Sequence, residues 1–104
     1  MPGLQPMKKT RDWCFTINNY NATDILLLEQ LGATCKYLIY GQEIADTGTP
    51  HLQGFLQFNY PTTFNRIKCL LNNKAHVEPR MGTVNQAIEL LQKRRTIHRI
   101  WKIS

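Results

Sequence analysis

Residues 37–58 read YLIYGQE, IADTGTP and HLQGFLQF in succession, and this stretch decides how the chain folds. An apolar run closes on Glu43, a connection with glycine and proline follows, and a second run begins at His51. Two such runs joined by a short connection predict a β-hairpin. Side chains two positions apart in a strand share a face, so we expect His51 and Gln53 to point the same way and Glu43 to lie beside His51.

These three side chains would offer one carboxylate, one imidazole and one amide oxygen. That donor set suits a hard divalent ion such as Mg²⁺ or Mn²⁺ better than zinc, which prefers sulfur and nitrogen. A cation held with open coordination positions can polarise a phosphate ester. A His-x-Gln pair in a strand is also common on an ordinary solvated face. Both interpretations of the pair therefore stay open on these residues alone.

Hydrophobic patterns outside the hairpin predict the remaining elements. In order they are a strand at 13–18, a helix over 25–31 capped by Asn21 or Thr23 and ended by Gly32, hairpin strands at 35–43 and 51–58, a helix started by Pro61 and Thr62, a strand at 75–78 and a third helix from about residue 84. This order predicts an α+β, ferredoxin-like (RRM-like) βαββαβ fold, an antiparallel sheet with helices on one face plus a C-terminal helix.

The open face of such a sheet can bind single-stranded nucleic acid if aromatic side chains stack on its bases. The aromatic residues of the predicted strands give four candidates, although aromatic residues in strands are usually part of the core: Phe15, Tyr37, Phe55 and Phe58.

The length and the charge of the chain restrict its possible domain organisation and binding partners. The chain has 104 residues, which suits one small domain with a modest core and excludes a second domain. Its formal charge of +6 is uneven, because through Glu89 the basic and acidic residues nearly cancel, whereas residues 93–102 carry basic side chains and no acid. A basic tail can bind nucleic-acid phosphates, but such runs are commonly solvated chain ends.

Cysteine usage and hydropathy indicate an intracellular protein. Cys14, Cys35 and Cys69 have no paired spacing, which argues against a disulfide framework and a zinc cluster. They are most simply small apolar residues in a reducing compartment. No apolar run approaches the roughly 18 residues of a membrane span. Residues 1–9 lack the apolar core of a secretion signal.

The order of the motifs resembles the nicking domain of rolling-circle replication initiator (Rep) proteins of circular single-stranded DNA viruses. These motifs are WCFTINN at 13–19, GQE at 41–43, the HLQ run and NQAIELLQK at 85–93. The resemblance is to the circovirus and nanovirus type of HUH endonuclease, in which glutamine replaces the second metal-binding histidine. It implies a flexible N-terminus at 1–11, a nicking domain at 12–89 and a tail at 90–104, without the helicase domain that usually follows.

The resemblance also implies roles for individual residues. Glu43, His51 and Gln53 would bind Mg²⁺ or Mn²⁺, and the partner would be single-stranded DNA at a viral origin in the host nucleus. The first motif would serve DNA recognition and the sheet framework, although an ordinary buried strand followed by an Asn-rich turn has the same pattern: Phe15, Thr16, Asn18 and Asn19. His76 matches no ligand of the family, and we expect it to be structural or exposed.

The third motif of the family needs a tyrosine and, three residues later, a lysine on the same helix face. The tyrosine hydroxyl attacks the phosphodiester, becomes joined to the 5′ phosphate and releases a 3′ hydroxyl, while the lysine steadies the phosphate. Lys93 is present here, but Leu90 occupies the tyrosine position. Leucine has no nucleophile, so we expect cleavage by the family mechanism to fail.

Two hypotheses explain the tail from Leu90 to Ser104. Codons compatible with this tail exist for which a shift of one base reads Tyr-Cys-Lys-Lys, which looks like the missing motif, so the tail would be out of frame. Alternatively, the tail is a genuine helix with an imperfect amphipathic stripe: Ile88, Leu91, Ile97 and Trp101. The family resemblance favours the frameshift, and the nucleotide sequence of the gene decides between them.

Three functional classes follow. The first is a metal-dependent enzyme that nicks and joins single-stranded DNA. The second is a module that binds origin DNA without cutting it. The third is an unrelated ferredoxin-like RNA-binding domain, which would need exposed aromatic residues on the two central strands and no shared use of Glu43, His51 and Gln53.

Overall fold

The computed structural model describes residues 9–44 and 46–80. Its elements follow the predicted β-α-β-β-α-β order, which confirms the α+β fold class: β1 (Lys9–Asn18), α1 (Ala22–Thr34), β2 (Tyr37–Ile44), β3 (Pro50–Thr63), α2 (Phe64–Leu70) and β4 (His76–Pro79). The predicted third helix, Leu90, Lys93 and the tail lie outside the described residues. Within the described ranges, no helix has the length and apolar character needed to cross a membrane.

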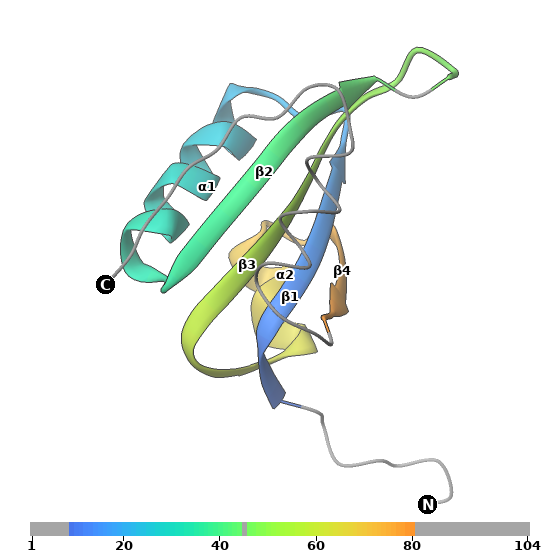
Figure 1. Cartoon of the computed structure of the whole chain (residues 1–104). Coiled ribbons are helices and arrows are strands. Elements are labelled where there is room, and N and C mark those ends of the chain that lie inside the picture. The colour runs from blue at the N-terminus through green and yellow to red at the C-terminus, as the bar shows by residue number, and fades with distance from the viewer. Residues whose placement is uncertain (1–8, 45, 81–104) are drawn as a thin grey trace, which may run out of the picture.

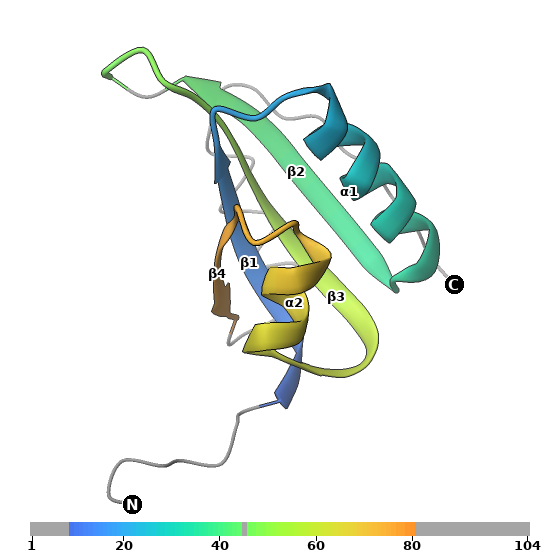
Figure 2. The ribbon, with the colours of Figure 1, turned by 180° about the vertical axis from the view of Figure 1, so that it is seen from behind.

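The four strands form one antiparallel sheet in the order β2-β3-β1-β4. Both described helices cover the same face of this sheet, as the two opposite views show (Figures 1 and 2). We call this the helix face and the other the open face. The central strands β3 and β1 therefore support both the core and any site on the open face.

The main core lies between the helix face and the two helices. Side chains of β1 alternate between buried and half-buried positions from Trp13 onward, as expected for a strand that packs one face. The core joins sheet residues to Leu28 of α1 and Ile67 of α2; its other members are Trp13, Phe15, Ile17, Cys35, Leu38, Tyr40, Leu52, Leu56, Leu71, Ala75 and Val77.

Gly54 makes the close packing of this core possible. It pairs with Phe15 of β1 and with Tyr40 of β2. A Cβ atom at Gly54 would lie 2.5 Å from the carbonyl oxygen of Ile39 and 2.5 Å from Cζ of Phe15. The ring of Phe15 thus occupies the space that any side chain at position 54 would need.

The start of α1 is as predicted, but its end is not. Asn21 and Asp24 form a reciprocal capping box, in which each side chain accepts a hydrogen bond of 3.0 Å from the backbone N–H of the other. The helix continues through Gly32 to Thr34 and ends where Cys35 adopts an extended backbone. Gly32 was therefore wrongly predicted as the terminator, because its backbone remains helical.

The largest differences between predicted and observed strand boundaries are at the start of β1 and at the end of β3. β1 begins at Lys9, since Lys9 and Thr10 pair with Thr63 and Thr62 of β3, so the strand starts before its predicted first residue, Trp13. β3 runs through Pro61 to Thr63, and the side chain of Thr63 caps α2. The proline is tolerated because the pairing is irregular in this region and β3 has passed its last partner on β2.

Candidate metal centre and nucleic-acid interface

Glu43 and His51 lie directly opposite each other on β2 and β3, on the open face. Nε2 of His51 is 2.7 Å from Oε1 of Glu43. The His51 side chain is 16% exposed and that of Glu43 is 12% exposed, so both groups are held in place and still reachable from solvent. The predicted contact between these two residues is confirmed.

Gln53 follows on the same face of β3, two residues after His51. Its neighbours in register are Gly41 on β2 and Thr16 on β1. Gly41 has no side chain that could lie between Gln53 and the β2 strand. All three side chains therefore emerge from one face of two adjacent strands, which is the geometric condition for binding a common cation.

The chemistry of the Glu43–His51 pair fits a divalent ion. Neighbouring ligands of an ion with bonds of about 2.1 Å lie about 3 Å apart. The observed 2.7 Å between Nε2 and Oε1 is a hydrogen bond that a bound ion would replace, and it already brings the two donor atoms close to that separation. Among the described residues, no group of three or more His, Cys, Asp and Glu could hold a metal ion.

Two of the expected DNA contacts lie next to this cluster. Asn18 of β1 pairs with His51, and Thr16 of β1 pairs with Gln53. Thr16 also pairs with His76 of β4 on its other side. We call these aligned open-face residues the polar band: Glu43, His51, Gln53, Asn18, Thr16 and His76. The band crosses all four strands, and His76, to which the sequence assigned no role, is at its β4 end.

Asn19, the residue directly after Asn18 of the polar band, has an unusual backbone conformation. Its φ is 52°, a left-handed value that asparagine tolerates better than most residues. Its N–H donates a 2.8 Å hydrogen bond to the carbonyl of Pro50, the residue before His51. The Asn18–Asn19 turn is thus tied by its backbone to the strand that carries His51.

The aromatic candidates for base stacking are buried. Phe15 is 1% exposed and belongs to the helix-face core, so its assignment as a DNA contact is wrong. Phe58 is half-buried and packs against the same core. Tyr37 and Phe55 are on the open face with ring centroids 6.3 Å apart, but only 7% and 1% exposed. None of these four candidates therefore presents the exposed ring that the RNA-binding class requires, although Tyr60, near the end of β3, is 79% exposed.

Comparison with known proteins identifies the family. The family model for viral replication proteins (Viral_Rep) matches residues 10–94. The chain belongs to the viral replication protein family. This result confirms the resemblance inferred from the motifs.

Individual relatives of this family match over most of the chain. It is 44% identical over 78 residues to the Replication-associated protein of human associated cyclovirus 1, covering 73% of this chain and 28% of that protein. It is 36% identical over 93 residues to the Replication-associated protein of porcine circovirus 1, covering 88% and 29%. It is 39% identical over 75 residues to the Master replication protein of subterranean clover stunt virus, covering 72% and 24%. The chain thus spans less than a third of the length of these relatives.

Two side chains near the polar band, Tyr40 and Cys14, are poorly suited to act as nucleophiles there. Tyr40 is part of the helix-face core, where burial foremost raises the pKa of its hydroxyl, with further contributions from Glu29 and Tyr20. Cys14 is on the open face, but burial raises the pKa of its thiol, and Arg80 only partly opposes this effect. The Cys14 thiol is therefore protonated near neutral pH and poorly nucleophilic, and Tyr40 lies in the core on the opposite face of the sheet.

Proposed function

We propose that this replication-family chain is the metal-binding core of a nicking domain that acts on single-stranded DNA at a viral origin in the host nucleus. The observation that carries the proposal is the 2.7 Å contact between His51 and Glu43, with Gln53 on the same open face. Proteins of this family type would cut and rejoin single-stranded DNA. With Leu90 in place of the tyrosine, the chain as it stands would bind DNA without cutting it.

Each part of the polar band would have a separate task. Glu43, His51 and Gln53 would hold Mg²⁺ or Mn²⁺, which when bound supplies charge that polarises the scissile phosphodiester. Asn18 and Thr16 pair with His51 and Gln53, so their polar side chains would contact a DNA strand that crosses the sheet there. By resemblance, Lys93 would steady the phosphate.

Binding of Mn²⁺ and of a single-stranded hairpin-origin oligonucleotide tests the proposal. We expect Mn²⁺ to strengthen DNA binding and a chelator to reverse the effect. Gln53→Ala should weaken Mn²⁺ binding by about tenfold or more, because it removes a ligand oxygen. Isothermal titration measures the ion affinity, and fluorescence anisotropy measures DNA binding.

Gln57→Ala is the matched control. Gln57 is the same residue type on the same strand and face, but its side chain donates a 2.8 Å hydrogen bond to Asp12, far along the sheet from His51. We expect its Mn²⁺ affinity to remain within about twofold of the parent. Equal behaviour of the two variants, together with DNA binding that ignores the chelator, would contradict the metal site and favour an unrelated nucleic-acid-binding domain.

A further inference from the structure

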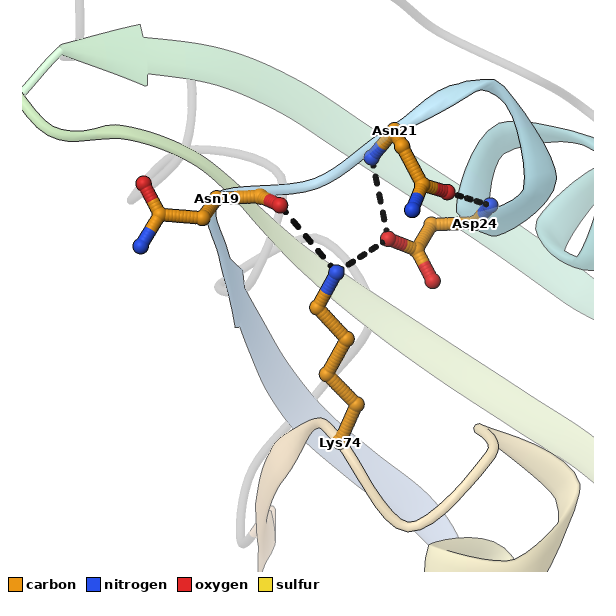
Figure 3. A network of polar contacts seen from close by, with 4 residues as sticks. All are labelled: Asn19, Asn21, Asp24 and Lys74. Atoms are coloured by element: carbon orange, nitrogen blue, oxygen red, sulfur yellow. Dashed lines mark hydrogen bonds and ion pairs between the residues drawn. The ribbon is translucent and has the colours of Figure 1, made fainter.

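Lys74, in the loop between α2 and β4, reaches across to the turn between β1 and α1 (Figure 3). Its Nζ donates a 2.7 Å hydrogen bond to Oδ2 of Asp24 and a 3.1 Å hydrogen bond to the carbonyl oxygen of Asn19. The lysine therefore joins two parts of the chain that are 50 or more residues apart.

Asp24 gives this connection a fixed geometry. Its side chain is 4% exposed, and its Oδ2 also accepts the hydrogen bond from the N–H of Asn21. A buried carboxylate is costly unless a cation and hydrogen-bond donors compensate its charge. Because the capping box fixes Asp24, it also fixes the position of the Lys74 ammonium group.

The ammonium group in turn donates a hydrogen bond to Asn19, whose backbone has a left-handed conformation. A left-handed conformation is unfavourable for residues other than glycine, although asparagine tolerates it better than most, and it is stabilised where the surroundings hold it. Asn19 is held on both sides, by Lys74 at its carbonyl and by the Pro50 carbonyl at its N–H. Removing Lys74 would leave Asn19, among the described residues, with its hydrogen bond to Pro50.

That held segment ends at the candidate metal centre. Asn18 pairs with His51, and Pro50 directly precedes His51. We propose that Lys74 is a positioning residue for the metal centre, which holds the Asn18–Asn19 turn so that His51 keeps its place opposite Glu43. This inference rests on the proposed metal-dependent function and assigns Lys74 no contact with the ion.

Lys68 provides a matched control for Lys74. Its Nζ donates a 2.6 Å hydrogen bond to the carbonyl of Ala75, so its change to methionine also removes one charge and one lysine–backbone bond. That bond links α2 to the start of β4 and does not involve the β1–α1 turn. If Lys74 contributed only to the stability of the fold, Lys74→Met and Lys68→Met would change Mn²⁺ affinity by similar amounts.

The experiment compares Lys74→Met, Lys68→Met and Lys74→Arg by Mn²⁺ titration at a temperature well below each Tm. We expect Lys74→Met to weaken Mn²⁺ affinity by about three- to tenfold, because coupling through intermediate residues is commonly of this size. Lys68→Met should remain within about twofold of the parent, and Lys74→Arg should retain most of the affinity because its guanidinium can donate to both oxygens. Amide hydrogen exchange at Asn19 should become faster only in Lys74→Met.

The outcomes separate this inference from the proposed function. If the parent chain binds no Mn²⁺, the proposed function fails and the inference fails with it. If the parent binds Mn²⁺ and Lys74→Met binds it equally tightly, the inference alone is overturned. Should Lys74→Met fail to fold, Asp24→Asn keeps the shape of the cap while removing the charge that holds Lys74. Unchanged Mn²⁺ affinity in folded Asp24→Asn would also overturn the inference.

Discussion

No covalent protein–DNA adduct is expected when the chain as it stands is incubated with Mn²⁺ and a single-stranded hairpin-origin oligonucleotide. In the nicking mechanism that the family resemblance implies, a bond would form between a tyrosine oxygen and phosphorus while the bond from phosphorus to the 3′ oxygen breaks, and that oxygen would take up a proton. Leu90 offers no oxygen for this step. Loss of a nucleophile lowers such rates by several orders of magnitude. Denaturing gel electrophoresis of labelled DNA reveals the adduct directly.

Leu90→Tyr should restore part of this activity. We expect a detectable adduct that depends on Mn²⁺ and is lost in the double variant Leu90→Tyr with His51→Ala. Recovery is expected to be partial if the residues after Leu90 are also out of frame. A chain whose residues from Leu90 onward follow the shifted reading, beginning Tyr-Cys-Lys-Lys, should then form more adduct than Leu90→Tyr. An adduct formed by the unchanged chain would show instead that a different side chain serves as the nucleophile.

The sequence predicted the hairpin and the face that carries the candidate site because these depend on local rules. Alternation along β3 places His51 and Gln53 on one face, and the register of a hairpin brings Glu43 opposite His51. The same rule separates Phe15 from Thr16 and Asn18, since adjacent strand residues point to opposite faces. Applying it to the whole first motif would have assigned Phe15 to the core and the other two to the open face.

The parts that the sequence did not predict depend on contacts between distant elements. Nothing in the local pattern indicates that Lys74 bonds to Asp24 and Asn19, because that contact exists only after α2 and β4 have packed on the sheet. The place of His76 likewise follows from the register of β4 against β1, which a strand of four residues does not reveal. Side-chain alternation gives two faces, whereas tertiary packing decides what each face meets.

Gly54→Ala should lower the free energy of unfolding by about 3 kcal/mol, at the upper end of the cost of overpacking a core. The added Cβ would lie 2.5 Å from the Ile39 carbonyl oxygen, a backbone atom of the neighbouring strand, and 2.5 Å from the Phe15 ring. Neither contact can be relieved by rotating the new methyl group. Chemical denaturation followed by circular dichroism measures the loss.

Gly48→Ala is the control for a glycine that is needed for its backbone alone. Gly48 has a φ of +87°, and no atom lies within 4 Å of the place that a Cβ would take there, so its substitution should cost about 1 kcal/mol. A Gly54→Ala cost no larger than this would contradict the packing argument.

A double-mutant cycle with Phe15→Leu separates the two contacts at Gly54, since neighbouring substitutions are not additive when they share a clash. The shorter leucine removes the ring atoms nearest to the new Cβ, but the Ile39 carbonyl stays in place. We therefore expect Gly54→Ala to lower the free energy of unfolding by less in the Phe15→Leu background than in the parent. The loss in that background should nevertheless exceed the loss caused by Gly48→Ala. An unchanged cost in both backgrounds would assign the whole effect to the backbone of β2. A cost that disappears would assign it to the Phe15 ring, and position 54 would then be a glycine because of its aromatic neighbour alone.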